Sequence, residues 1–386
     1  MTTNQDRRAG WAVAVALVGL LAFTATAAHA QPRTTSAGQA DTASTRSVVP
    51  GVSGQIAVRP DGKVFATVSK ETVRQWKTAN GHRGGPVLAV DAGPINSIAY
   101  SADGQLLAVA GNREVTLWDP TTGQQARPPL TEHTGPVRSV AFSPAGLLMA
   151  TAGDDGSVRV WDATTGDLLR TLSGHSGGVR FVVFSPDGER LASVGAGDDN
   201  TVRLWWAGTG LPIGSPLRVN PGPVYAVTFN PTGRLLAASG GGRTVRVWNA
   251  ATGTPVGKPL TSSTAPVYAL TYSRGGRTLA TSSGGNNTVQ LWNMATRKAA
   301  TEPLTGHTGP VRAMRFDPSG KLLVTGSDDG SVRVWNATTG SQKGKALLGH
   351  TGAVWAVRVT PDGKRLISAG ADNKARIWRV KAKPAA

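Results

Sequence analysis

Tryptophan recurs along the chain at a nearly constant interval of 42–44 residues. A fixed period of this length indicates one supersecondary unit that is repeated along the chain. One such unit cannot bury its apolar face alone, so the copies must pack on one another. Function is therefore expected on the loops and rims of a rigid body rather than in a unique core. The periodic residues are Trp76, Trp118, Trp161, Trp205, Trp248, Trp292, Trp335 and Trp378.

The seventh repeat shows the strand pattern most clearly. Alternation over residues 311–316 predicts an innermost strand. Residues 317–320 (DPSG) predict a hairpin turn, because Pro presets φ and Gly accepts a positive φ. A second strand is expected over 322–326, a third over 331–335 and an outer one over 345–348. Each repeat is thus predicted to be an antiparallel meander of four strands in an all-β fold.

Three short segments carry a resemblance to a known family. GHTGPV, SPDG and TGSDDGSVRVWN occur in the chain, and variants of them recur in register. From about residue 50 to residue 380 the chain resembles the WD-repeat β-propeller family, whose fold is a ring of four-stranded blades around a central channel. The resemblance implies a buried Trp–hydroxyl–His–Asp tetrad in four repeats: His133, Thr151, Asp155 and Trp161; His175, Ser193, Asp199 and Trp205; His307, Thr325, Asp329 and Trp335; His350, Ser368, Asp372 and Trp378.

Other repeats depart from the tetrad pattern, so their blades are expected to hold by packing. The second repeat has Asp91 in place of His, the fifth keeps Trp248 but has Asn220, Ala238 and Gly242, and the sixth has Ser263, Thr281 and Asn286 with Trp292.

The number of blades follows from the ends of the repeat region. Only eight residues follow Trp378, so the last repeat has no outer strand of its own. A closed ring leaves no open edge, and the β-capable segment 44–49 could supply the missing strand. The expectation is eight blades closed by this N-terminal strand. The alternative is a seven-blade ring in which Val87–Val90 closes the sheet and residues 50–76 lie outside.

The N-terminus has the features of a secretory signal. Arg7 and Arg8 precede an uncharged stretch over residues 9–28, and Ala28-His29-Ala30 offers small residues at the cleavage site. A retained membrane anchor is the alternative. The expected division is 1–30 signal peptide or membrane anchor, 31–44 flexible tether, and 45–386 propeller, with the protein outside the cytoplasm.

Composition argues against catalysis. The chain has no Cys, which excludes disulfides and thiolate metal sites, and six His, of which four belong to the expected tetrads. The other two are His29 in the signal segment and His82 in a Gly-rich loop, so no His is left for a catalytic triad or a metal cluster, and no catalytic residue, cofactor or metal is expected. The formal charge is +18, but the arginines are spread along the repeats. We interpret them as filling the solvent side of strands rather than as a specific nucleic-acid site.

The candidate partner-binding residues follow the first valine of each innermost strand. In WD-repeat proteins this position often contacts partners, and Arg, Tyr and Trp are enriched in interface hot spots. The positions are Ser53, Asn96, Arg138, Arg180, Tyr225, Tyr268, Arg312 and Trp355, of which the last six are the predicted partner-binding set.

These features predict a monomeric, non-enzymatic exported scaffold that binds a protein partner through the tetrad-bearing face. One alternative is a ligand sensor or enzyme that uses the central channel. Another is a binder of acidic polymers or anionic membrane through the basic surface, which steep salt dependence would reveal.

Overall fold

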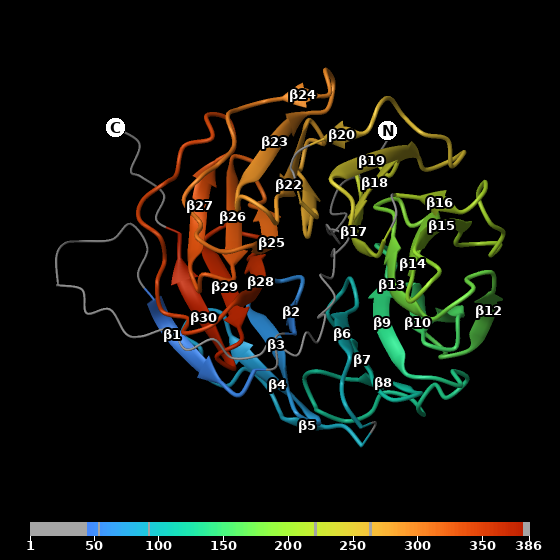
Figure 1. Ribbon diagram of the computed structural model, residues 1–386. Coiled ribbons are helices and arrows are strands. Elements are labelled where there is room, and N and C mark those ends of the chain that lie inside the picture. Colours follow the sequence, from blue (N-terminus) through green and yellow to red (C-terminus); the bar gives the residue numbers. More distant parts are fainter. Residues whose placement is uncertain (1–44, 53–54, 92, 220–221, 262–264, 381–386) are drawn as a thin grey trace, which may run out of the picture.

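The chain forms a ring of eight antiparallel blades (Figure 1). The computed structural model describes residues 45–52, 55–91, 93–219, 222–261 and 265–380, and these contain thirty strands and no helix. A membrane-spanning helix is accordingly absent from the described ranges. The segments expected to be signal and tether lie outside them.

Each blade is a meander whose strands run from the inner rim of the ring outwards. The innermost strands are β2 (Ile56–Val58), β6 (Ser97–Tyr100), β9 (Val137–Phe142), β13 (Val179–Phe184), β17 (Val224–Phe229), β21 (Leu270–Tyr272), β25 (Val311–Phe316) and β28 (Val354–Val359). The second strands are β3 (Val64–Ser69), β7 (Leu107–Ala110), β10 (Leu148–Gly153), β14 (Arg190–Gly195), β18 (Leu235–Gly240), β22 (Thr278–Ser282), β26 (Leu322–Ser327) and β29 (Arg365–Gly370). The third strands are β4 (Thr72–Lys77), β8 (Val115–Trp118), β11 (Val158–Asp162), β15 (Thr201–Trp206), β19 (Thr244–Asn249), β23 (Val289–Asn293), β27 (Val332–Asn336) and β30 (Lys374–Arg379). The outer strands are β5 (Leu88–Ala89), β12 (Leu168–Leu172), β16 (Leu217–Arg218), β20 (Leu260–Thr261), β24 (Lys298–Ala299) and, in the last blade, β1 (Thr45–Pro50).

The outer strands are the least regular part of the blades. In the second and seventh blades the fourth segment makes isolated bridges, Val115 to Leu130 and Val332 to Leu347, instead of a continuous strand. The outer strand expected over 345–348 is thus reduced to a bridge at Leu347. This segment has one neighbour to pair with, and Leu348 is 72% exposed, so little apolar burial holds a longer strand in place.

An N-terminal strand closes the ring, as the sequence predicts. β1 pairs antiparallel with β30 from Thr45 opposite Trp378 to Pro50 opposite Lys374. The seven-blade alternative is wrong, because Leu88 pairs with Val73 of β4 and so belongs to the outer strand of the first blade. The ring therefore has eight blades, with the two ends of the repeat region in one sheet.

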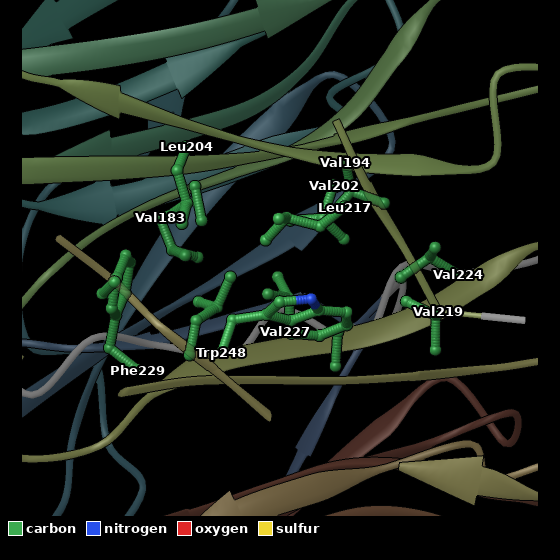
Figure 2. Close-up of a cluster of buried hydrophobic side chains, with 14 of the residues drawn as sticks. Val183, Val194, Val202, Leu204, Leu217, Val219, Val224, Val227, Phe229 and Trp248 are labelled. Carbon is green, nitrogen blue, oxygen red and sulfur yellow. The ribbon is translucent and has the colours of Figure 1, made fainter. Parts of the chain in front are cut away.

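The apolar core consists of eight clusters, and each is shared by two neighbouring blades. Figure 2 shows the cluster between the fourth and fifth blades, where Val183 and Leu204 face Phe229 and Trp248. The interblade tryptophans are buried in every blade, from 2% to 8% exposed. Because side chains alternate between the two faces of a strand, each blade presents one apolar face to the blade before it and one to the blade after it.

The two faces of β1 allow a matched test of closure. Val49 is fully buried in the cluster that joins the eighth blade to the first, whereas Val48 is 48% exposed. We expect Val49→Asp to lower the free energy of unfolding by about 3 kcal/mol or more, because it buries a carboxylate in an apolar cluster. Val48→Asp should change it by less than about 0.5 kcal/mol. Chemical denaturation of both variants decides this, and similar losses would contradict closure by β1.

Candidate functional site

The four complete tetrads form as the sequence predicts, and they build one face of the ring. In the seventh blade Trp335 Nε1 lies 2.9 Å from Thr325 Oγ1, which lies 2.7 Å from His307 Nε2. His307 Nδ1 lies 2.9 Å from Asp329 Oδ2. The third, fourth and eighth blades repeat these bonds. Every donor meets an acceptor when the imidazole is neutral with its proton on Nδ1, so each tetrad ties two loops to the two middle strands.

The electrostatics of the tetrads agree with a neutral histidine. Burial lowers the pKa of His133, His175 and His350 and outweighs the opposing effect of the aspartates. Burial raises the pKa of Asp155, but hydrogen bonds from Ser157, Arg159 and His133 outweigh burial and hold that pKa well below its usual range. The tetrads of the third, fourth and eighth blades therefore pair a neutral imidazole with a carboxylate at neutral pH.

The incomplete repeats keep part of the relay. The indole N–H of Trp76 donates to Thr67 and that of Trp292 donates to Thr281. Trp118 donates to Thr116, two residues earlier on its own strand, a partner that the sequence pattern did not reveal because Val109 occupies the usual hydroxyl position. The indole N–H of Trp248 has no hydrogen-bond acceptor among the described residues, because Ala238 replaces the hydroxyl residue in this blade. Asn220 and Ser263 lie outside the described residues.

In several repeats an arginine stands two positions before the tryptophan, and in two of them it contacts the tetrad. Arg159 Nη1 lies 2.8 Å from Asp155 Oδ2, and Arg376 Nη1 lies 2.7 Å from Asp372 Oδ2. Arg376 is 6% exposed. The expectation that arginine fills the solvent side of strands is therefore wrong at these positions, because the carboxylate below attracts the guanidinium inwards. The signal was present as an RVW or RIW motif in several repeats.

Five of the six predicted partner-binding residues stand at the same strand position in successive blades on the tetrad-bearing face, and we call them the arginine–tyrosine arc: Arg138, Arg180, Tyr225, Tyr268 and Arg312. The rings of Tyr225 and Tyr268 have centroids 5.3 Å apart, and Arg312 Cζ lies 4.1 Å from the centre of the Tyr268 ring. All five side chains are at least partly exposed. The arc spans five successive blades, from the third to the seventh.

Two aspartates fix the ends of the arc. Arg138 Nε lies 2.9 Å from both carboxylate oxygens of Asp154, and Arg312 Nε lies 3.1 and 3.0 Å from those of Asp328. The second Nη of each arginine also bonds its aspartate. Asp154 and Asp328, which are partly exposed turn residues, thus each hold a guanidinium in a bidentate pair.

The other three positions that follow an innermost-strand start lie outside the arc or outside the described residues. Trp355, the sixth predicted partner-binding residue, is partly buried. The ring of Tyr268 makes its contacts with Tyr225 and Arg312. Asn96 donates to the carbonyl oxygens of Gly111 and Val137 and so joins two blades. Ser53 lies outside the described residues.

The opposite face carries a groove of about 810 Å³ over the first three blades. Its lining includes Asp103, Asp119, Arg127 and Leu147, all from turns. None of the predicted site residues lies there. The described residues contain no group of three or more His, Cys, Asp or Glu side chains that could hold a metal ion.

Comparison with known proteins identifies the repeat. A family model described as "WD domain, G-beta repeat" matches residues 78–119, 125–162, 166–205, 214–249, 253–293, 299–336 and 341–379. These matches begin after the first three strands of the first blade, whose sequence is the most degenerate. No match was found among curated proteins. The crystal structure of the computationally designed protein Ika8 superposes with a TM-score of 0.75 at 22% identity, over 87% of this chain and 99% of that chain, which supports the fold.

The tetrads and the incomplete fifth blade allow a paired test of the relay. Trp335→Phe leaves Thr325 without its indole donor inside a buried network, whereas Trp248→Phe breaks no such bond. We expect the first variant to lose roughly 1–3 kcal/mol more stability than the second, the cost of an unsatisfied buried polar group. Denaturant midpoints measured side by side decide it, and equal losses would show that tryptophan acts here through size alone.

Acid should destabilise the propeller in two stages. The unfolded chain protonates its histidines near pH 6.5, whereas the native pKa values of His133, His175 and His350 are lower, so stability falls as the pH drops below about 6.5. The tetrad aspartates, whose native pKa values are also lowered, lose their contribution below about pH 4. Urea midpoints between about pH 8 and about pH 5 test the first stage, and a flat profile would refute it.

Proposed function

Since this chain belongs to the WD-repeat family of β-propellers, whose members generally mediate protein interactions or scaffolding, we propose that it is a non-enzymatic exported scaffold that binds a protein partner through the arginine–tyrosine arc. The observation that carries the proposal is the arc itself. Arginine and tyrosine stand at equivalent positions in five neighbouring blades, and Tyr225, Tyr268 and Arg312 contact one another in sequence.

The arc is held in place before any partner arrives. The bidentate pairs of Arg138 with Asp154 and of Arg312 with Asp328 fix its ends, and the tilted contact between the rings of Tyr225 and Tyr268 helps to fix its centre. Side chains that are already ordered lose little conformational entropy on binding. A rigid row of this kind suits recognition of a folded or extended protein segment.

The charges along the arc favour a particular partner chemistry. Arg138 and Arg312 are matched by aspartates, whereas Arg180 has no bonded carboxylate among the described residues, and burial lowers its pKa while the neighbouring Tyr225 raises it. A partner segment that places one carboxylate beside apolar side chains would pair with Arg180 and cover the two tyrosine rings. Its binding should depend only weakly on salt, unlike that of an acidic polymer.

Substitutions in the arc test this function. The double variant Arg180→Ala Tyr268→Ala should lose a protein that wild type captures from extracts of the producing organism, and its Kd for the purified partner should rise about 30-fold or more, as for hot-spot residues. Leu147→Ala, which alters a 63% exposed side chain in the opposite-face groove, is the matched control. A partner that binds all three proteins equally would refute the arc as the interface.

Export is the second part of the proposal and rests on the N-terminal sequence. Arg7-Arg8, the uncharged stretch and Ala28-His29-Ala30 have the order of a secretory signal. We expect the exported protein to begin near Gln31, as N-terminal sequencing would show. A product that begins at Met1 and fractionates with membranes would instead support the retained anchor.

A further inference from the structure

Two arginines on neighbouring innermost strands differ in size and charge from the residues at the same position in the other blades. Arg315 of β25 and Arg358 of β28 occupy the same position, the residue before the last of each innermost strand. β25 and β28 lie side by side at the inner rim of the ring (Figure 1). The other blades carry small side chains at this position: Ala57, Ala99, Ala141, Val183, Thr228 and Thr271. We call Arg315 and Arg358 the axial pair.

No carboxylate neutralises the axial pair within the described part of the chain. Arg358 Nη1 donates to the carbonyl oxygen of Val357 at 3.0 Å. The guanidinium of Arg315 makes no hydrogen bond or ion pair among the described residues. Several arginines nearer the tetrad-bearing face are paired with acids, among them Arg138, Arg312 and Arg376. Both axial side chains are partly buried.

The two charges disfavour each other. Burial lowers the pKa of Arg315, and burial together with the positive charge of Arg315 lowers the pKa of Arg358 to about 10. Like charges that are desolvated side by side destabilise a fold unless an anion compensates them. A pair that serves only packing would be replaced by small uncharged side chains at no loss, as in the six other blades.

We propose that Arg315 and Arg358 form a binding site for the phosphate group of a small ligand at the inner rim of the ring. A phosphate monoester carries about −1.5 to −2 charges at neutral pH, which matches two guanidinium groups. Its oxygens accept the parallel N–H bonds that a guanidinium donates in bidentate geometry.

The site is separate from the protein interface proposed above. Arg312 lies at the tetrad-bearing end of β25, three residues before Arg315, and the hairpin turn on the opposite face begins just after Phe316. A small phosphate ligand would therefore bind towards the face without tetrads. The two proposals fail independently, because the arc variants leave the axial pair intact.

Calorimetric titration of the full chain with inorganic phosphate tests the site. Wild type should bind phosphate saturably, with one site per chain, and phosphate should raise its thermal midpoint more than chloride does at the same ionic strength. In Arg315→Met Arg358→Met the affinity should fall at least about tenfold, while stability without phosphate should equal or exceed that of wild type. Arg243→Met, at an exposed arginine between β18 and β19, should bind as wild type does.

A second variant keeps the test decisive if the methionine variant folds poorly. Arg315→Lys Arg358→Lys retains both charges but loses the bidentate geometry, so it should bind phosphate more weakly than wild type and still fold. Phosphate affinity that is unchanged in both double variants, absence of saturable binding by wild type, or an equal effect of chloride would each overturn the proposal.

Discussion

Burial of apolar surface between neighbouring blades is the constraint on which the whole structure depends. Every apolar cluster contains residues of two blades and none is confined to one. An open ring would leave two half-clusters facing water, so closure is required for the stability of all eight blades. β1 closes the ring with only six residues. They complete the last sheet and place Val49 in the same apolar cluster as Ile377 and Trp76.

The tetrads add specificity to a body that packing already holds. The fifth blade shows this within the chain itself, because it lacks the hydroxyl and the aspartate but keeps the largest of the clusters, with Trp248 at 2% exposure. What the tetrad adds in other blades is attachment of the loops. His133 and Asp155, for example, come from two different loops, and Thr134 N–H also donates to that aspartate. The face with four tetrads is therefore the face on which loop side chains can be held in fixed positions.

The period of tryptophan and the strand alternation were enough to predict the fold, the blade number and the closing strand, because these depend on local patterns repeated many times. Single side chains were harder. Thr116 replaces a hydroxyl from another strand, and the aspartate partners of Arg138 and Arg312 lie sixteen residues away in each case. Such contacts depend on register and on loop conformation, for which one sequence gives no repeated signal. The arc could be anticipated as a set of equivalent positions, but the tilted ring contact between Tyr225 and Tyr268 could not.

The distribution of arginine connects these observations. The chain has far more basic than acidic residues, so carboxylates are scarce and their positions decide which guanidinium groups are fixed and which are left available. Aspartates in the loops of the tetrad-bearing face fix Arg138, Arg312 and Arg376. At the inner rim no aspartate of the described residues bonds Arg315 or Arg358, and the protein bears the cost of two adjacent desolvated charges. A rigid ring cannot move the two guanidinium groups apart. A bound phosphate would remove the unfavourable energy of these adjacent desolvated charges. The proposal thus assigns part of the +18 charge of the chain to a defined site.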